Sequence, residues 1–192
     1  QRDPCIMHRQ LLLDRLSGYH TADKHEEKMR DQIEHFVRTH ADCFERSLSV
    51  GHITGSAWIL DRTGTHVLLT HHRKLGRWLQ LGGHADGEPN VLDVARREAI
   101  EESGLENMDP ISVDLFDVDI HEIPEHKDEP KHLHFDIRFL FEADKEIPLR
   151  ISGESNRLEW IALEDVARYT NEESMMRMVR KTFAWRSSRP VS

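Results

Sequence analysis

The sequence predicts an α/β fold, a layered sandwich with a helical extension at its N-terminus. Three observations lead to this class. Strand-like segments with alternating apolar residues lie on both sides of a central helical segment, two further helical segments end the chain, and the first 48 residues have only helical patterns. The length of 192 residues suits one domain and an extension. We therefore expect a helical extension over residues 1–48 and one α/β domain over residues 49–192.

The extension has one clear amphipathic segment. Met29, Ile33, Phe36 and Val37 fall at i, i+4, i+7 and i+8, which is the spacing of one helix face. Such a face serves packing within the chain or between two chains. We expect it to carry no chemistry, and a homodimer through this face is one expectation.

The elements of the α/β domain follow from periodicity and turn residues. Pro89 suits the first position of a helix and Gly104 the position just past its end, so a helix is predicted over 89–103. The apolar period changes phase at Leu115 and Phe116, which predicts a β-bulge there. The predicted strands are 53–60, 65–70, 78–81, 111–120, 132–141 and 158–161, and the last two helices are 163–169 and 172–185.

Composition and charge exclude several classes of protein. The chain has 35 acidic and 26 basic residues and a formal net charge of -9, which disfavours bulk nucleic-acid binding because that needs a basic face. No apolar run approaches the roughly 18 residues of a membrane span, and no signal peptide is visible, so no membrane partner is expected. Cys5 and Cys43 make no disulfide framework. A reducing cytoplasm is the simplest compartment.

A cluster of carboxylates carries the chemistry. Glu98, Glu101 and Glu102 stand at i, i+3 and i+4, so they share one face of the predicted helix. Like charges at this spacing repel by roughly 0.2–0.5 kcal/mol per pair. Mg²⁺ prefers oxygen ligands and shares carboxylates with substrate phosphates. The cluster therefore predicts a site for a divalent cation, and the alternative is a solvated acidic face.

The segment around this cluster resembles the Nudix box, the signature of Nudix hydrolases. That pattern is Gly, five residues, Glu, seven residues, then Arg-Glu-apolar-any-Glu-Glu-any-Gly-apolar. The positions in register are Gly83, Arg97, Glu98, Ala99, Glu101, Glu102, Gly104 and Leu105. One position departs, because Pro89 stands where the pattern has its first Glu. Either the neighbouring Glu88 takes that role or the role is absent.

The resemblance covers about residues 53–185 and implies fold, reaction and ligands. It implies an α/β/α sandwich with a mixed sheet, and cleavage of a nucleoside diphosphate linked to another group with Mg²⁺ or Mn²⁺. The partner would be this small molecule. Arg97 would orient the site by pairing with a carboxylate, and the carbonyl of Gly82 would be a further metal ligand. The metal ligands matched directly are Glu98, Glu101 and Glu102.

The predicted mechanism is attack of a metal-activated water at phosphorus, with one of the three glutamates or a nearby carboxylate as base. Two alternatives use the same fold. An isomerase acting on isopentenyl diphosphate would need a catalytic cysteine, and Cys5 and Cys43 lie outside the matching domain. A catalytically silent nucleotide sensor would lose box glutamates; Pro89 favours this reading and the three retained glutamates oppose it.

A row of polar residues marks the strand 132–141. His132, His134 and Asp136 share one strand face and would form a transition-metal site, a polar wall beside the substrate, or a hydrogen-bonded structural row. Alternate residues spread over about 13 Å from first to third, so all three cannot easily reach one ion. His84 lies in the loop ahead of the helix, and we hypothesise that this loop docks on the row. Unchanged activity and loop order in a His134→Ala variant would oppose that hypothesis.

Two further residues are candidates for substrate or metal binding. Arg73, in the basic loop 71–77, could attract phosphates, and the alternative is a solvated loop. Glu154, just before the last strand, could add a carboxylate to the metal site, although Glu159 competes for that role.

Overall fold

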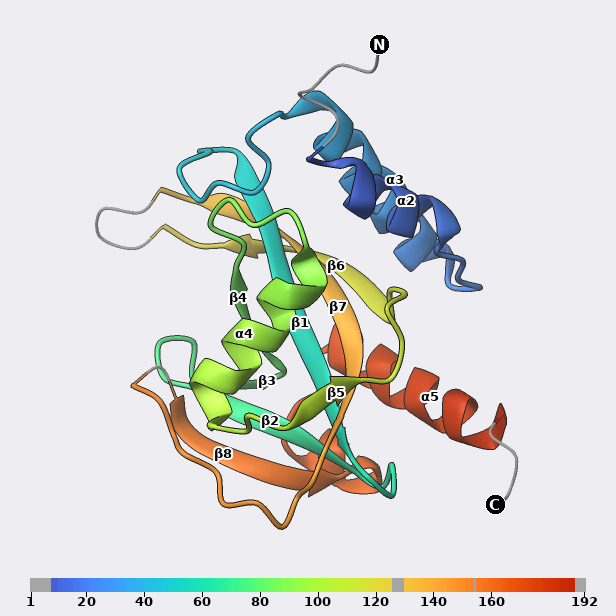
Figure 1. Ribbon diagram of the computed structural model, residues 1–192, viewed down its shortest axis with the longest axis vertical. Helices are drawn as coiled ribbons and strands as arrows, with labels where there is room; N and C mark the ends of the chain where they lie inside the picture. The colour runs from blue at the N-terminus through green and yellow to red at the C-terminus, as the bar shows by residue number, and fades with distance from the viewer. Residues whose placement is uncertain (1–7, 126–129, 154, 189–192) are drawn as a thin grey trace. The chain divides into compact units, whose positions relative to one another are not determined.

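The computed structural model describes residues 8–125, 130–153 and 155–188 (Figure 1). In chain order its elements are α2 (Gln10–Gly18), α3 (Lys24–Thr39), β1 (Gly51–Asp61), β2 (His66–His72), β3 (Arg77–Leu79), β4 (Leu81–His84), α4 (Val91–Ser103), β5 (Met108–Pro110), β6 (Asp117–Ile123), β7 (His132–Ala143), β8 (Ser155–Ala162), the 3-10 helix η1 (Leu163–Arg168) and α5 (Glu173–Ser188).

The strands of the described residues form one mixed eight-stranded sheet. Its main path is β3-β2-β1-β7-β5, while β4 pairs with β1, β6 with β7 and β8 with β2. The helices α2 and α3 precede the first strand. The predicted α/β class, with a mixed sheet and an N-terminal helical segment, is confirmed.

The chain divides into two compact units. The first comprises residues 1–56, 82–97 and 112–139, and the second comprises residues 57–81, 98–111 and 140–192. The elements β1, α4 and β7 each supply residues to both units.

In the first unit, α3 packs its predicted apolar face inside the chain. Asp23 caps the helix, because its side chain accepts the backbone N–H groups of His25 and Glu26. The four residues of the face are buried, and the ring of Phe36 stacks on Phe135 of β7 with 4.0 Å between ring centroids. Helices α2 and α3 lie side by side, and α3 contacts β6 (Figure 1). The face that suggested a homodimer is therefore covered within this unit.

In the second unit, β2 is paired on both sides and a buried tryptophan anchors α5. Strand β2 pairs antiparallel with β3 and β8. Trp58 of β1 is fully buried, and its Nε1 donates to Oγ1 of Thr182 in α5 at 2.9 Å. A turn follows β1, where the side chain of Asp61 accepts the N–H groups of Thr65 and His66, each at 2.8 Å.

The predicted strand 111–120 is wrong in extent. The chain leaves β7 after Ile111, whose N–H donates to the Leu140 carbonyl at 2.9 Å. It returns at Phe116, whose N–H donates to the Arg138 carbonyl at 2.9 Å. The phase change in the apolar pattern comes from this excursion over residues 111–116 and not from a one-residue bulge. Sequence periodicity records the change of phase but not how much chain lies between the two paired segments.

Other elements also differ from prediction. Helix α4 begins at Val91, two residues later than expected, because the Asn90 carbonyl accepts the first helical N–H groups, from Asp93 and Val94. Gly104 ends it as predicted, with φ 74°. The predicted strand 78–81 is split between β3 and β4, and the predicted helix 163–169 is the 3-10 helix η1.

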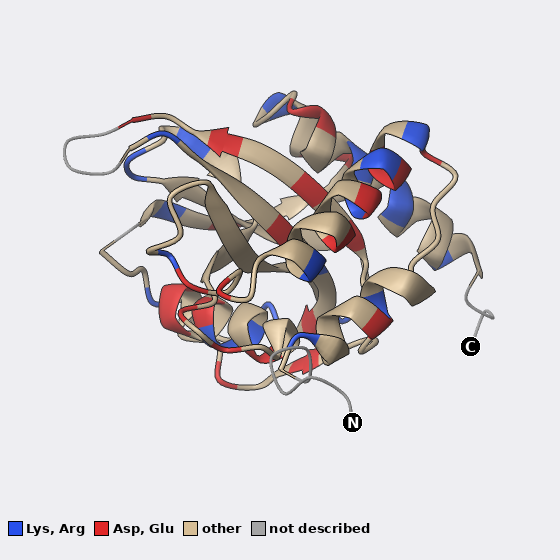
Figure 2. Ribbon diagram, turned by 90° about the horizontal axis from the view of Figure 1, so that it is seen from above, with Lys and Arg blue, Asp and Glu red and all other residues tan. Residues whose placement is uncertain are grey.

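Charged residues are mixed along the elements. Figure 2 shows basic and acidic residues interspersed on the helices, without a continuous basic stretch. Among the described residues, no helix is long and apolar enough to cross a membrane.

Candidate active site

The box begins where β4 meets β1 in close backbone contact. A Cβ atom on Gly82 would lie 2.6 Å from the carbonyl oxygen of Gly55 and 2.4 Å from Oγ of Ser56. Backbone atoms cannot move aside as a flexible side chain can, so no side chain fits at residue 82. The sequence requires glycine here because of this approach.

The loop after β4 is fastened to the segment before β1. The guanidinium of Arg46 donates two hydrogen bonds to Asp86, one of them from Nε to Oδ1 at 2.6 Å. The N–H of Gly87 donates to the Phe44 carbonyl at 3.1 Å. Asp86 has φ 51°, which is uncommon for a residue with a side chain. The hydrogen bonds from Arg46 hold the pKa of Asp86 below its usual value, so the ion pair helps to keep this turn in place.

Arg97 ties α4 to the same loop. Its Nη2 donates to the carbonyl oxygen of His84 at 2.8 Å. This contact joins Arg97 to the backbone at His84. The pairing of Arg97 with a carboxylate, which the resemblance implies, stays a prediction. Arg97 thus fixes the distance between His84 and the first half of α4.

The side chain of Glu88 hydrogen-bonds to the backbone at the start of α4. Its Oε1 accepts the N–H of Asn90 at 2.9 Å. The Asn90 side chain in turn accepts Nη1 of Arg15 at 3.0 Å and donates to Oδ2 of Asp93 at 2.5 Å. A carboxylate here also suits the positive end of the helix dipole. The structure therefore uses Glu88, next to Pro89, to organise the N-terminus of α4.

The three box glutamates, in the second unit, differ in exposure. Glu102 is only 5% exposed, Glu98 is half-buried and Glu101 is exposed. Their helix is held at its C-terminal end, where the N–H of Arg150 donates to the Ser103 carbonyl at 2.8 Å. A buried carboxylate is costly unless hydrogen bonds or a cation compensate it. Hard oxygen donors on one helix face fit a magnesium or manganese ion by their chemistry.

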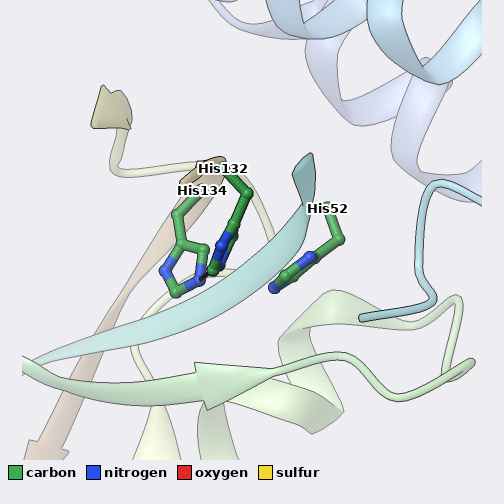
Figure 3. Close-up of side chains that lie close together, drawn as sticks. All are labelled: His52, His132 and His134. Carbon is green, nitrogen blue, oxygen red and sulfur yellow. Dashed lines mark hydrogen bonds between the residues drawn. The ribbon is translucent and has the colours of Figure 1, made fainter. Parts of the chain in front are cut away.

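In the first unit the structure brings the two histidines of β7 together with a third from β1. His132 Nε2 and His134 Nε2 are 3.2 Å apart, and both side chains point toward His52 (Figure 3). One ring nitrogen from each of the three lies within 4.8 Å of the other two. The ring of His84 adjoins this group, with its centroid 5.0 Å from that of His52 and 5.2 Å from that of His134. His84, predicted in a loop, is the last residue of β4 and contacts His134 of the histidine row.

The sequence patterns did not predict a role for His52. The pattern that could have found it is the alternation of His52, Thr54 and Ser56 along an otherwise apolar strand. Burial lowers the pKa of His52 to about 4 and that of His134 to about 2, and the neighbouring imidazoles act in the same direction. Both rings are therefore neutral near pH 7.

Asp136 does not share the surroundings of the histidines. Its Oδ1 accepts the hydroxyl groups of Thr54 and Ser56 at 2.9 and 2.7 Å. Its Oδ2 accepts Nε of Arg138 at 2.7 Å, and Arg138 also donates to Asp117 at 3.2 Å. Asp136 is 1% exposed and belongs to this buried ionic network. The predicted row of three is therefore two histidines facing His52 and one structural aspartate.

The remaining candidates are Arg73, Glu154 and Cys43. Arg73 is exposed, and its Nη1 donates to the Gly153 carbonyl at 3.4 Å. Glu154 lies outside the described residues, and its competitor Glu159 forms an ion pair with Arg157. Cys43 is fully buried, and burial raises the pKa of its thiol to about 12, which excludes it as a nucleophile at neutral pH.

Comparisons with known proteins agree with this geometry. The family model described as NUDIX domain matches residues 52–182. No curated protein matches the chain significantly. Among solved structures, an Ap4A hydrolase from C. elegans is 17% identical with a TM-score of 0.54, and the match covers 71% of this chain and 98% of that one.

Two further structures share the fold at similar identity. The MutT protein from Methanosarcina mazei is 18% identical with a TM-score of 0.52, and the match covers 73% of this chain and 99% of that one. The E. coli dihydroneopterin triphosphate pyrophosphohydrolase is 15% identical with a TM-score of 0.52, and the match covers 67% of this chain and 92% of that one. The chain therefore belongs to the NUDIX domain family, as a Nudix-type pyrophosphohydrolase.

Proposed function

We propose that this enzyme hydrolyses a diphosphate linkage in a nucleoside diphosphate derivative, using Mg²⁺ or Mn²⁺. The observation that carries the proposal is the box itself, with Glu98, Glu101 and Glu102 on consecutive turns of α4 and Glu102 buried. The name of one similar structure, an Ap4A hydrolase, supports the substrate class. The name of another, a dihydroneopterin triphosphate pyrophosphohydrolase, supports cleavage of a phosphate anhydride.

The proposed ligands of the metal are the three glutamates, with the carbonyl of Gly82 as a further donor. When bound, the ion would neutralise charge on the diphosphate and would make the attacking water a better nucleophile. One box glutamate or a nearby carboxylate accepts the proton of the attacking water while the water oxygen forms a bond to phosphorus. The anhydride P–O bond breaks, and its electron pair leaves with the second phosphate. Arg97 takes part as a positioning residue through its hydrogen bond to the loop at His84.

The wider substrate site is also a proposal. Arg73 is exposed and positively charged, which suits contact with a phosphate. His84, His132 and His134 would line the site beside the loop. Asp136 is assigned to the buried network, since its hydrogen bonds to Thr54, Ser56 and Arg138 occupy it. Glu154 stays a prediction.

The proposal includes the domain boundaries of the chain and the cellular location of the protein. Residues 1–48 form the extension and 49–192 the catalytic domain, which is supported by the start of the family match at residue 52. A cytoplasmic location rests on the composition, with two cysteines and 32% charged residues. A homodimer is not part of the proposal, because the apolar face of α3 packs on Phe135.

A nucleotide sensor without catalytic activity is the second candidate. Pro89 replaces the first glutamate of the box, and the neighbouring Glu88 accepts the N–H of Asn90. If the first box glutamate were needed for turnover, this chain would bind metal and nucleotide without cleaving them.

One experiment separates the two candidates. Nucleoside diphosphate derivatives, including dinucleoside polyphosphates and nucleotide sugars, are incubated with the enzyme and Mg²⁺ or Mn²⁺, and phosphate is measured after a phosphatase step. We expect metal-dependent release that is lost in Glu102→Gln and kept in Glu106→Gln, because Glu106 is exposed at the helix end. Metal and nucleotide binding without release on any substrate would favour the sensor, and Pro89→Glu would then be the first variant to test for recovered activity.

A further inference from the structure

Three histidines from two strands of the first unit meet in a buried group. His52 comes from β1, and His132 and His134 come from β7 (Figure 3). Together they offer three ring nitrogens within 4.8 Å of one another. Two nitrogen ligands on one tetrahedral zinc ion, each about 2.0–2.1 Å from it, lie about 3.3–3.4 Å apart. The 3.2 Å between Nε2 of His132 and Nε2 of His134 is close to that separation.

His132 is held in the tautomer that a metal requires. Its Nδ1 lies 2.8 Å from the carbonyl oxygen of Pro130. A carbonyl only accepts, so Nδ1 carries the proton and donates it. The lone pair of the neutral ring is then on Nε2, which faces His134. Metal-binding histidines commonly have this arrangement, in which the second nitrogen donates to a backbone carbonyl.

His52 supplies an independent observation. Its side chain is 2% exposed, and neither ring nitrogen has a hydrogen-bond partner among the described residues. A buried polar group left without a partner costs about 1–3 kcal/mol. The ring lies 5.0 Å from that of His132 and 4.9 Å from that of His134, measured between centroids. An ion bound between the three rings would satisfy a nitrogen of His52 that the protein leaves without a partner.

We propose that His52, His132 and His134 form a second metal site, selective for a borderline transition-metal ion, with Zn²⁺ as the expected occupant. Imidazole nitrogen suits zinc, whereas magnesium prefers oxygen. The donor set therefore separates this site from the carboxylates of α4. His84 adjoins the group and could complete a fourfold coordination.

The ion would act as a clip between strands. It would link β1 to β7 within the first unit. It would also fix the position of His134, which His84 contacts at the end of β4. The backbone of His84 is itself fixed by Arg97. This inference does not rest on the proposed hydrolysis, because zinc binding can be measured without substrate.

The test uses the full chain without a polyhistidine tag, stripped with a chelator and titrated with Zn²⁺ by calorimetry. We expect one ion per chain, and X-ray absorption at the zinc edge should show at least three nitrogen ligands at about 2.0–2.1 Å. Zinc should also raise the melting temperature, because it binds only the folded chain. His52→Phe keeps a ring in the buried space, and His134→Gln keeps a polar group. Each substitution should weaken zinc binding by at least about tenfold, because losing even a residue that only hydrogen-bonds a metal ligand costs about that much affinity.

Two controls locate the ion. His35→Gln removes an exposed histidine of α3, and Glu102→Gln alters the box, so both should bind zinc as the wild type does. Absence of stoichiometric binding to the wild type would overturn the proposal. Wild-type affinity in both His52→Phe and His134→Gln would also overturn it, and so would loss of zinc binding in either control.

Discussion

Nη2 of Arg97 donates a hydrogen bond to the carbonyl oxygen of His84 at 2.8 Å, which joins the helix of the Nudix box to the loop that precedes it. Arg97 immediately precedes Glu98 in the same helix, and Gly82 lies two residues before His84. A single side chain therefore joins the first half of α4 to the end of β4 within the first unit.

Arg97→Ala should lower kcat by about 100-fold, the loss that a displacement of about 1 Å can cause in a positioned site. Arg97→Lys should recover only part of this rate, because an ammonium group does not have the planar geometry of a guanidinium. Steady-state kinetics and thermal melting would be measured on both variants. Arg168→Ala, at an exposed arginine of η1, is the control and should leave kcat unchanged. Wild-type kcat in Arg97→Ala would remove Arg97 from the positioning machinery.

Gly82→Ala should destabilise the fold by about 1–3 kcal/mol, the usual cost of overpacking. The new methyl group would lie 2.6 Å from the Gly55 carbonyl, so β4 must shift away from β1. Urea unfolding gives the free energy. Gly18→Ala is the matched control, since a Cβ there meets nothing within 4 Å, and helix propensity makes this change neutral or stabilising. Equal stability of the two variants would contradict the close approach at Gly82.

Arg138→Met should cost about 3–5 kcal/mol of folding free energy, because it leaves the buried carboxylates of Asp117 and Asp136 without their cation. Arg168→Met breaks an exposed ion pair with Asp165 and should cost less than about 1 kcal/mol. Urea unfolding at pH 7 compares the two. A loss below about 1 kcal/mol for Arg138→Met would show that water or other groups compensate these carboxylates.

Asp61 should make the free energy of unfolding depend on pH in acidic solution. Burial opposes its ionisation, but hydrogen bonds from Thr63, His66 and Thr65 outweigh burial and lower its pKa from 3.8 to about 2. Because the folded pKa is depressed, its contribution is fully present above about pH 4 and is lost as pH falls toward 2. The shift corresponds to about 2 kcal/mol. The stability difference between wild type and Asp61→Asn should therefore shrink from pH 5 to pH 2, and a constant difference would contradict the assignment.

Much of the fold could be predicted because its causes are local. The spacing of Met29, Ile33, Phe36 and Val37 places one helix face in the core, and all four residues are buried. Gly104 ends α4 with a positive φ that glycine adopts at no steric cost. Boundaries were less accurate where the cause lies elsewhere in the chain. Helix α4 starts after Pro89, at Val91, and Asn90 just before it accepts a hydrogen bond from Arg15 of the distant helix α2.

The candidate sites also differ in how far the sequence alone predicts them. The box is a pattern within one segment, so the sequence alone identified its glutamates and the family. Alternation along β7 placed His132, His134 and Asp136 on one strand face, but it could not say what each would meet. Asp136 pairs with Arg138 on its own strand and accepts the hydroxyls of β1, while the histidines turn to His52.

The sequence by itself determined the family, the order of helices and strands and the carboxylate face of α4, because all of these depend on residues close together in the chain. Only the tertiary structure decided that His52 faces His132 and His134, and that Arg97 reaches the carbonyl of His84. The pairing of strands and the packing of α4 create these contacts. Spacing along a single segment does not encode which residues of a distant segment will lie opposite.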